Sequence, residues 1–140
     1  MYKNEFDNYL KQNKKFKAYI FYGQSIFLVE QYALVIAQSL GNDDEIEKLY
    51  FEEYDFKYTK DKLLQSSLFS SNNIILIKLD KKIPKKEVDS LIEACNLNPD
   101  STLIFACLGD SDFKTMEASF SLKTNSAAVR FFLPTDTEAI

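Results

Sequence analysis

Apolar residues gather in five short runs along the chain. The clearest runs cover 18–22, 74–79 and 102–107, and each is almost entirely aliphatic or aromatic. Weaker runs cover 48–52 and 127–132. Near-continuous apolar runs of this length are typical of strands that are buried on both faces of a parallel sheet. The pattern therefore predicts five strands, with Gly23 and Pro134 closing the first and the last.

Between these runs the apolar residues return at intervals of three and four, which is the spacing of an amphipathic helix. Helices are predicted over residues 2–13, 25–40, 59–65, 84–95 and 111–120. Ser25 suits an N-cap, Gly41 a C-terminal stop and Pro84 a first helical turn. Strands that alternate with helices after a leading helix predict an α/β fold. We expect three α/β/α layers around a mostly parallel five-stranded sheet.

The 140 residues are enough for one domain with a sizeable core. Residues 1–133 contain all five predicted strands, whereas 135–138 look like the start of a new helix. We therefore expect residues 134–140 to begin a following domain that is cut short here. The N-terminus lacks an apolar signal region and no apolar run approaches 18 residues, so the expected location is cytoplasmic.

The composition of the chain argues against several classes of function. The net charge is −4 with a pI of about 4.9, and Arg130 is the single arginine. This balance disfavours a protein whose main task is to grip nucleic acid. No histidine is present, which excludes zinc sites with histidine ligands and Ser–His or Cys–His catalytic pairs. Cys95 and Cys107 lie in apolar stretches and are interpreted as buried, reduced thiols.

The loop after the first predicted strand does not suit a bound phosphate. A phosphate-binding loop needs several glycines, which expose backbone N–H groups, and a Lys-Ser or Lys-Thr pair. Here the sequence offers only Gly23 and no lysine, and bulky Ile26 and Phe27 stand where the phosphate would lie. The dinucleotide fingerprint fails for the same reason. We therefore predict no nucleotide cofactor.

Asp80 follows the strand at 74–79, where related folds hold magnesium or accept a phosphoryl group. A lone aspartate at a strand end is more often a turn residue. A phosphorylatable receiver domain would also need acidic residues after the first strand and a lysine after the fifth. Neither is present, so the sequence predicts no catalytic site in this domain.

Leu68 and Phe69 form an apolar pair inside the polar stretch that runs from Gln65 to Asn73. Spacing alone leaves two interpretations open: the pair closes the end of the core, or it is an exposed anchor for a partner's pocket. Burying both side chains would contribute roughly 3–6 kcal/mol before the costs of association.

Several segments resemble the N-terminal domain of the delta subunit of the bacterial DNA polymerase III clamp loader. They are the strand and turn 19–23 with 27–30, the sequence Ser67-Leu68-Phe69-Ser70 before strand 74–79, the lysine-rich 81–86, and 98–103. The resemblance implies an AAA+-like domain, a degenerate relative of P-loop NTPases, that has lost its nucleotide site. It also implies that the chain is part of the DNA polymerase III holoenzyme.

By the same resemblance, the partner is the sliding clamp (the beta subunit), and Leu68 with Phe69 enters an apolar pocket on that ring. Gln65, Ser67, Leu68 and Phe69 are then the clamp-binding residues, because Gln65-x-x-Leu-Phe looks like a short clamp-binding motif. Other clamp-loader subunits would be partners of the full-length protein. Lysines 81, 82, 85 and 86 and the cluster at 11–17 are expected to be solvated, so that any DNA contact is indirect or weak.

Two rival hypotheses remain. One is a nucleotide-dependent AAA+ or P-loop enzyme with an atypical phosphate loop. The other is a structural domain in which Leu68 and Phe69 belong to the core.

Overall fold

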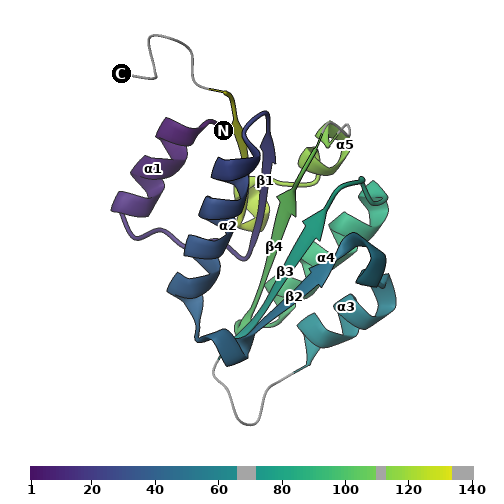
Figure 1. Cartoon of the computed structure of the whole chain (residues 1–140). Helices are drawn as coiled ribbons and strands as arrows, with labels where there is room; N and C mark the ends of the chain where they lie inside the picture. Colours follow the sequence, from purple (N-terminus) through teal and green to yellow (C-terminus); the bar gives the residue numbers. More distant parts are fainter. Residues whose placement is uncertain (66–71, 110–112, 134–140) are drawn as a thin grey trace.

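The computed structural model describes residues 1–65, 72–109 and 113–133. Its centre is a five-stranded sheet in which every neighbouring pair of strands is parallel, in the order β2-β3-β4-β1-β5 (Figure 1). The strands are β1 (Ala18–Gly23), β2 (Ile46–Tyr50), β3 (Asn73–Leu79), β4 (Ser101–Cys107) and β5 (Ser126–Phe131). The predicted α/β architecture is confirmed.

Helices cover both faces of the sheet. They are α1 (Lys3–Lys11), α2 (Ile26–Leu40), α3 (Phe56–Leu64), α4 (Lys85–Leu97) and the short α5 (Lys114–Glu117). The first two lie on one face, and α3 and α4 pack together on the other (Figure 1). Alternate side chains of β3 enter two separate cores, with Leu76 on the α2 side and Ile77 on the α4 side. This two-sided burial explains why the strands are apolar at nearly every position.

Two predicted elements are shifted or shortened. The second strand was predicted over 48–52 but ends at Tyr50, because the chain turns there into a short 3-10 helix, Phe51–Glu53. The carboxylate of Glu53 accepts the backbone N–H of Tyr50 at 3.0 Å, which stabilises the turn. The helix predicted over 111–120 is reduced to α5 among the described residues, followed by another short 3-10 helix, Leu122–Thr124.

Local capping explains where two helices begin. Ser25 is the N-cap of α2 as predicted, and its hydroxyl accepts the N–H of Leu28 at 3.2 Å. Helix α3 begins three residues earlier than predicted, because Asp55 caps it by accepting the N–H of Tyr58 at 2.8 Å. No helix in the described part of the chain is long and apolar enough to cross a membrane.

Both cysteines are free and buried, Cys95 on α4 and Cys107 at the end of β4. Burial raises the pKa of Cys95 to about 12 and that of Cys107 well above its usual value. At pH 8 a thiol with pKa 12 is ionised to roughly 1 part in 10,000, against about a quarter of a free thiol with pKa 8.5.

We therefore expect neither Cys95 nor Cys107 to react with a chromogenic disulfide reagent at pH 8 within minutes in the folded protein. Both should react at once in guanidinium chloride, because unfolding removes the burial that holds the pKa up. Rapid reaction of one thiol in the native protein would contradict the packing described for its surroundings.

Candidate functional site

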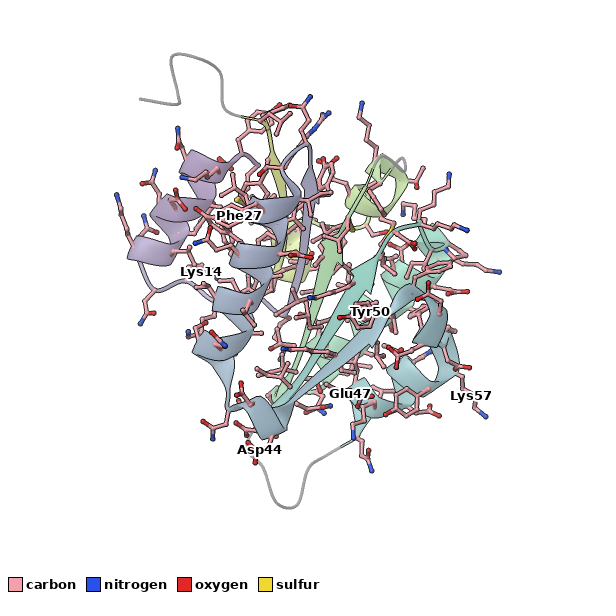
Figure 2. All side chains as sticks on the ribbon, in the orientation of Figure 1. Lys14, Phe27, Asp44, Glu47, Tyr50 and Lys57 are labelled. Atoms are coloured by element: carbon pink, nitrogen blue, oxygen red, sulfur yellow. The ribbon has the colours of Figure 1, made fainter. Side chains whose placement is uncertain are left out.

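The carboxyl-terminal edge of the sheet is where α/β folds commonly bind ligands. Here only Gln24 and Ser25 separate β1 from α2. The first turn of the helix is bonded within the chain, since Ser25 accepts the N–H of Leu28 through its hydroxyl and that of Val29 through its carbonyl. Ile26 and Phe27 then point outward, with 49% and 72% of their surfaces exposed. Figure 2 shows Phe27 on this first turn.

Gly23 allows β1 and β5 to pack closely at this edge of the sheet. Its φ is +130°, a conformation that side-chain-bearing residues rarely adopt, and a Cβ atom would lie 2.0 Å from the carbonyl oxygen of Phe131. The glycine thus lets β1 run against the end of β5, where the N–H of Gln24 donates to the same carbonyl at 2.8 Å. Gly23 is required by this contact between strands.

Arg130 also contacts neighbouring side chains at this edge. Its guanidinium lies 5.0 Å from the ring centre of Phe132 and 5.9 Å from that of Tyr22. The hydroxyl of Tyr22 donates to Glu117 at 2.5 Å, and burial together with this bond raises the pKa of Tyr22. The one arginine of the chain is therefore engaged with aromatic rings of its own sheet.

Asp80 lies exposed just after β3. Among the described residues, no three His, Cys, Asp or Glu side chains gather closely enough to hold a metal ion. The backbone bends at Asp80, where the chain leaves β3.

Among the predicted clamp-binding residues, the structure describes Gln65, which lies toward the opposite, amino-terminal edge of the sheet. Gln65 directly follows α3 and is exposed, at the margin of a depression of about 350 Å³ that is also lined by Tyr58, Asp61 and Lys62. Ser67, Leu68 and Phe69 lie outside the described residues. The structure therefore places the two ends of this segment, at Gln65 and Asn72.

Side chains from the turn before β4 bind the last carbonyls of α3. The amide of Asn98 donates to the carbonyls of Leu63 at 3.0 Å and of Gln65 at 3.2 Å. The hydroxyl of Ser101 donates to the carbonyl of Leu63 at 2.6 Å. A helix end leaves its last carbonyls without partners inside the helix. Here the partners come from more than 30 residues away in sequence.

Asn73 joins the two ends of the segment 66–71. Its side-chain amide donates to the carbonyl of Lys62 at 2.6 Å and to the hydroxyl of Ser101 at 3.2 Å. Its backbone N–H donates to the carbonyl of Asp100 at 2.8 Å. The residue that opens β3 is thus bonded to the end of α3 and to the turn before β4. We call Asn73, Asn98 and Ser101 the polar latch.

The side chain of Lys17 binds the turn that carries Asn98. Its ammonium group donates to the carbonyls of Asn98 at 3.0 Å and Pro99 at 2.9 Å. Partial burial lowers the pKa of Lys17, while Cys95 and Asp100 act in the opposite direction. The expectation that the lysines at 11–17 are all merely solvated is therefore wrong for Lys17, because this ammonium group holds the turn that carries Asn98.

The other lysines singled out in the sequence make surface contacts. The ammonium group of Lys81 lies 5.9 Å from the ring centre of Phe51. Lys85 pairs with Asp89 at 3.0 Å across one turn of α4. Exposed contacts of this kind contribute little to stability.

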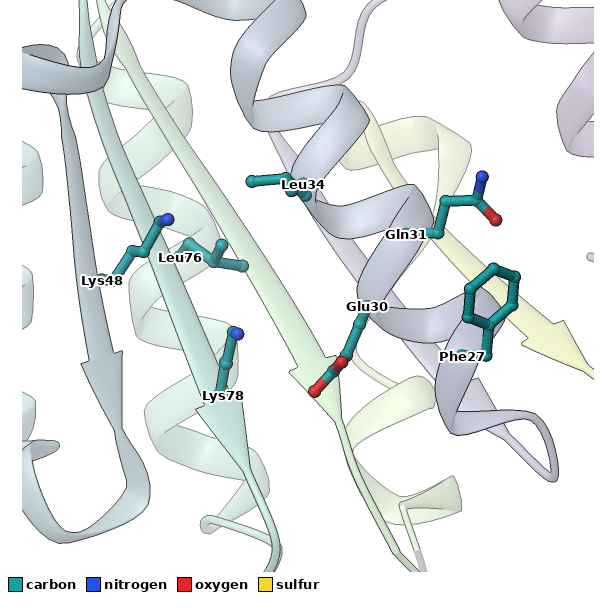
Figure 3. A pocket seen from close by; sticks show the side chains of 7 residues that line it. All are labelled: Phe27, Glu30, Gln31, Leu34, Lys48, Leu76 and Lys78. Carbon is teal, nitrogen blue, oxygen red and sulfur yellow. The ribbon is translucent and has the colours of Figure 1, made fainter.

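A groove of about 270 Å³ lies between α2 and the strands β2 and β3 (Figure 3). Figure 3 shows Leu34 pointing from α2 toward the strands, where Lys48 and Lys78 line the other side. Glu30 adds a negative charge to the same groove. The mixed charges favour no particular ligand, and we assign none.

The polar latch was missed in the sequence. The only local sign of it is the turn-like sequence Asn98-Pro99-Asp100-Ser101. Turn chemistry indicates where the chain reverses, whereas the carbonyls that Asn98 reaches are set by how α3 packs beside β4. No spacing rule connects residues 63 and 98.

Comparison with known proteins gives the family. The sequence profile described as "DNA polymerase III, delta subunit" matches residues 19–132. Curated proteins of two Helicobacter pylori strains, J99 and 26695, are 28% and 26% identical across alignments that cover 100% of this chain and 46% of each relative. The chain therefore spans about half the length of the curated relatives that it matches.

The fold matches that of a solved structure, the Bacillus subtilis DNA clamp loader delta protein. The TM-score is 0.66 at 15% sequence identity, over 94% of this chain and 43% of that one. An identity this low supports the fold alone. The family profile, however, covers most of the chain, including all five strands except the first residue of β1. The chain belongs to the family of DNA polymerase III delta subunits, as its sequence resemblance predicted.

Proposed function

We propose that this chain is the clamp-binding domain of a clamp-loader delta subunit, and that Leu68 and Phe69 anchor it in an apolar pocket of the sliding clamp. The observation that carries the proposal is the match of the delta-subunit family to residues 19–132, which includes the whole segment from Gln65 to Asn73. Gln65 and Ser67 would make polar contacts around the same pocket.

The position of the segment supports this proposal. Its ends lie at the amino-terminal edge of the sheet, away from the edge where Tyr22 contacts Arg130 and Glu117. Gln65 is exposed, and its carbonyl is held by Asn98. A binding segment whose ends are fixed to a rigid scaffold has less conformational freedom to lose on binding.

In the proposed mechanism, the domain helps to open the ring by binding one of its conformations more tightly than the other. A ring interface that exists in a closed and a sprung conformation shifts toward the sprung one when a ligand binds that state more tightly. An anchor formed by Leu68 and Phe69 would thus help to open the ring by differential affinity. Neither side chain performs a chemical reaction, so the domain needs no catalytic group of its own.

ATP hydrolysis would then belong to other subunits, which the full-length protein would contact through regions beyond this chain. The geometry after β1 supports that division, because Ser25 already binds the N–H groups of Leu28 and Val29 in the first turn of α2 and Phe27 lies exposed at the start of the helix. Any contact of this domain with DNA would be indirect or weak, and its place of action would be the cytoplasm.

The rival hypothesis, a nucleotide-dependent enzyme, predicts that the chain binds ATP. We expect calorimetric titration of the chain with Mg·ATP to show no binding with a Kd below about 100 µM. A site of that affinity needs a binding free energy of about −5.5 kcal/mol. The turn at Gln24 and Ser25 contains no lysine for the phosphates, and the N–H groups of Gln24, Leu28 and Val29 are already bonded within the chain. Saturable binding below that concentration would support the nucleotide-dependent alternative.

The proposal itself is tested by titrating the chain with the sliding clamp of the same organism. Saturable binding that is lost in the Leu68→Ala, Phe69→Ala double variant would support it. Binding that survives the double substitution would place the interface elsewhere on the chain.

A further inference from the structure

We propose that Asn98 is a positioning residue for the clamp-binding segment: it fixes where the chain leaves α3 and thereby presents Leu68 and Phe69 to the clamp. The proposal rests on the proposed function, and it concerns a residue that does not itself contact the partner. It also gives a role to the turn at 98–101, one of the segments on which the family resemblance was based.

The amide nitrogen and the amide oxygen of Asn98 both have hydrogen-bond partners. Its two amide hydrogens go to the carbonyls of Leu63 and Gln65, at 3.0 and 3.2 Å, and its amide oxygen accepts the N–H of Asp100 at 3.1 Å. The residue is only 7% exposed. An asparagine side chain offers two hydrogens and one oxygen, so each group has a partner here.

The contact with Gln65 is the important one. Gln65 is the last described residue before the segment 66–71, and its carbonyl bonds to the side chain of Asn98. On the far side of that segment, Asn73 is bonded to the carbonyl of Lys62. The two ends are therefore held at a set separation by side chains of the polar latch.

Fixed ends matter because Leu68 and Phe69 have to enter one pocket together. When the ends of a short loop are tied, the loop samples fewer conformations, and less entropy is lost when a partner orders it. Release of Gln65 from Asn98 would leave one more residue before the anchor without a fixed position, and would weaken binding without removing any contact with the clamp.

The variants that test this are Asn98→Asp and Asn98→Ala. Aspartate keeps the oxygen that accepts from Asp100 but turns the donor into an acceptor facing the carbonyls of Leu63 and Gln65. The matched control is Asn96→Ala. Asn96 likewise donates to two carbonyls, of Ile92 at 3.1 Å and Thr124 at 2.8 Å, but neither carbonyl belongs to α3 or to Gln65.

Clamp affinity is measured by calorimetry at a temperature where thermal melts show every variant more than 95% folded. We expect Asn98→Asp to raise Kd about tenfold, because the backbone of Gln65 would then have to be ordered when the clamp binds. Asn96→Ala should leave Kd within about twofold of the wild type. Amide hydrogen exchange across residues 66–71 should speed up in both Asn98 variants and stay unchanged in Asn96→Ala.

A double-mutant cycle with Leu68→Ala separates positioning from general destabilisation. If Asn98 acts through the anchor, Asn98→Ala should cost much less affinity once Leu68 is already truncated. Equal losses in both backgrounds, or an Asn98→Asp variant that binds as tightly as the Asn96→Ala control, would overturn the proposal.

The two proposals fail in distinguishable ways. If the wild-type chain does not bind the clamp at all, the proposed function fails. If the wild type binds but the Asn98 variants bind equally well, only the positioning role fails. Should Asn98→Asp not fold, Asn98→Ala is the milder variant, since it removes the donor without placing a charge against two carbonyls.

Discussion

Replacing Leu68 and Phe69 by Ala is expected to raise the Kd for the sliding clamp by at least about 100-fold, with almost no change in melting temperature. The two side chains would contribute roughly 3–6 kcal/mol of gross burial energy in the partner's pocket, and about 2.7 kcal/mol already corresponds to 100-fold. If the pair is exposed in the free chain, its truncation creates no cavity. Calorimetric titration and a thermal melt on the same protein measure both quantities.

The chain offers a matched control for this experiment. Ile26 and Phe27 are another adjacent aliphatic and aromatic pair, 49% and 72% exposed, at the opposite edge of the sheet. Replacing both by Ala should leave clamp affinity unchanged. If the Leu68–Phe69 variant instead lost about 4–10 kcal/mol of stability, at the usual ~2–5 kcal/mol per truncated core side chain, the pair would belong to the core.

A second large effect is expected for Gly23→Ala, which should lower the free energy of unfolding by roughly 3–5 kcal/mol. Two causes add: a φ of +130° that alanine tolerates poorly, and a Cβ atom placed 2.0 Å from the carbonyl oxygen of Phe131. The end of β1 would have to move away from β5, and bonds such as that from Gln24 to Phe131 would weaken. Chemical denaturation measures the loss.

Gly109 separates these two causes. Its φ is +109°, but among the described residues beyond its chain neighbours a Cβ atom there would meet no atom within 4 Å. Gly109→Ala should therefore cost only the backbone strain, about 1–2 kcal/mol. If Gly23→Ala were no more harmful than Gly109→Ala, the tight contact between Gly23 and β5 would be wrong.

Much of the fold was predictable because burial on both faces leaves a strong mark in the sequence. The strands β3 and β4 lie between two helical layers, so nearly every residue from Ile74 to Leu79 and from Thr102 to Cys107 is apolar. Ser25 was recognisable as an N-cap because its bond to Leu28 is local. Local chemistry and two-sided burial are the features that a single sequence displays most clearly.

The edges of elements were harder to predict. The end of β2 was placed two residues late, because Phe51 and Glu52 continue the aromatic and polar alternation of a strand while Glu53 folds back to the N–H of Tyr50. Helix α3 begins before its predicted start because Asp55 caps it. The sequence did not mark this start, because few apolar residues follow Asp55 at helical spacing.

The candidate site was predictable only in part. Gln65, Leu68 and Phe69 were proposed as candidates from the family resemblance, since spacing alone left the pair open to two interpretations. Asn98 was not found, because its partners Leu63 and Gln65 lie 35 and 33 residues away. A buried amide shows its role only when the packing of α3 beside β4 brings those carbonyls within reach.

The most direct test of the central claim uses a peptide of this chain that spans residues 63–72, in competition with the chain for the sliding clamp. We predict that the chain binds the clamp saturably and that excess peptide displaces it, whereas a peptide with Ala at 68 and 69 does not. Displacement that is equally strong with both peptides, or binding of the chain that neither peptide affects, would contradict the assignment of Leu68 and Phe69 as the anchor.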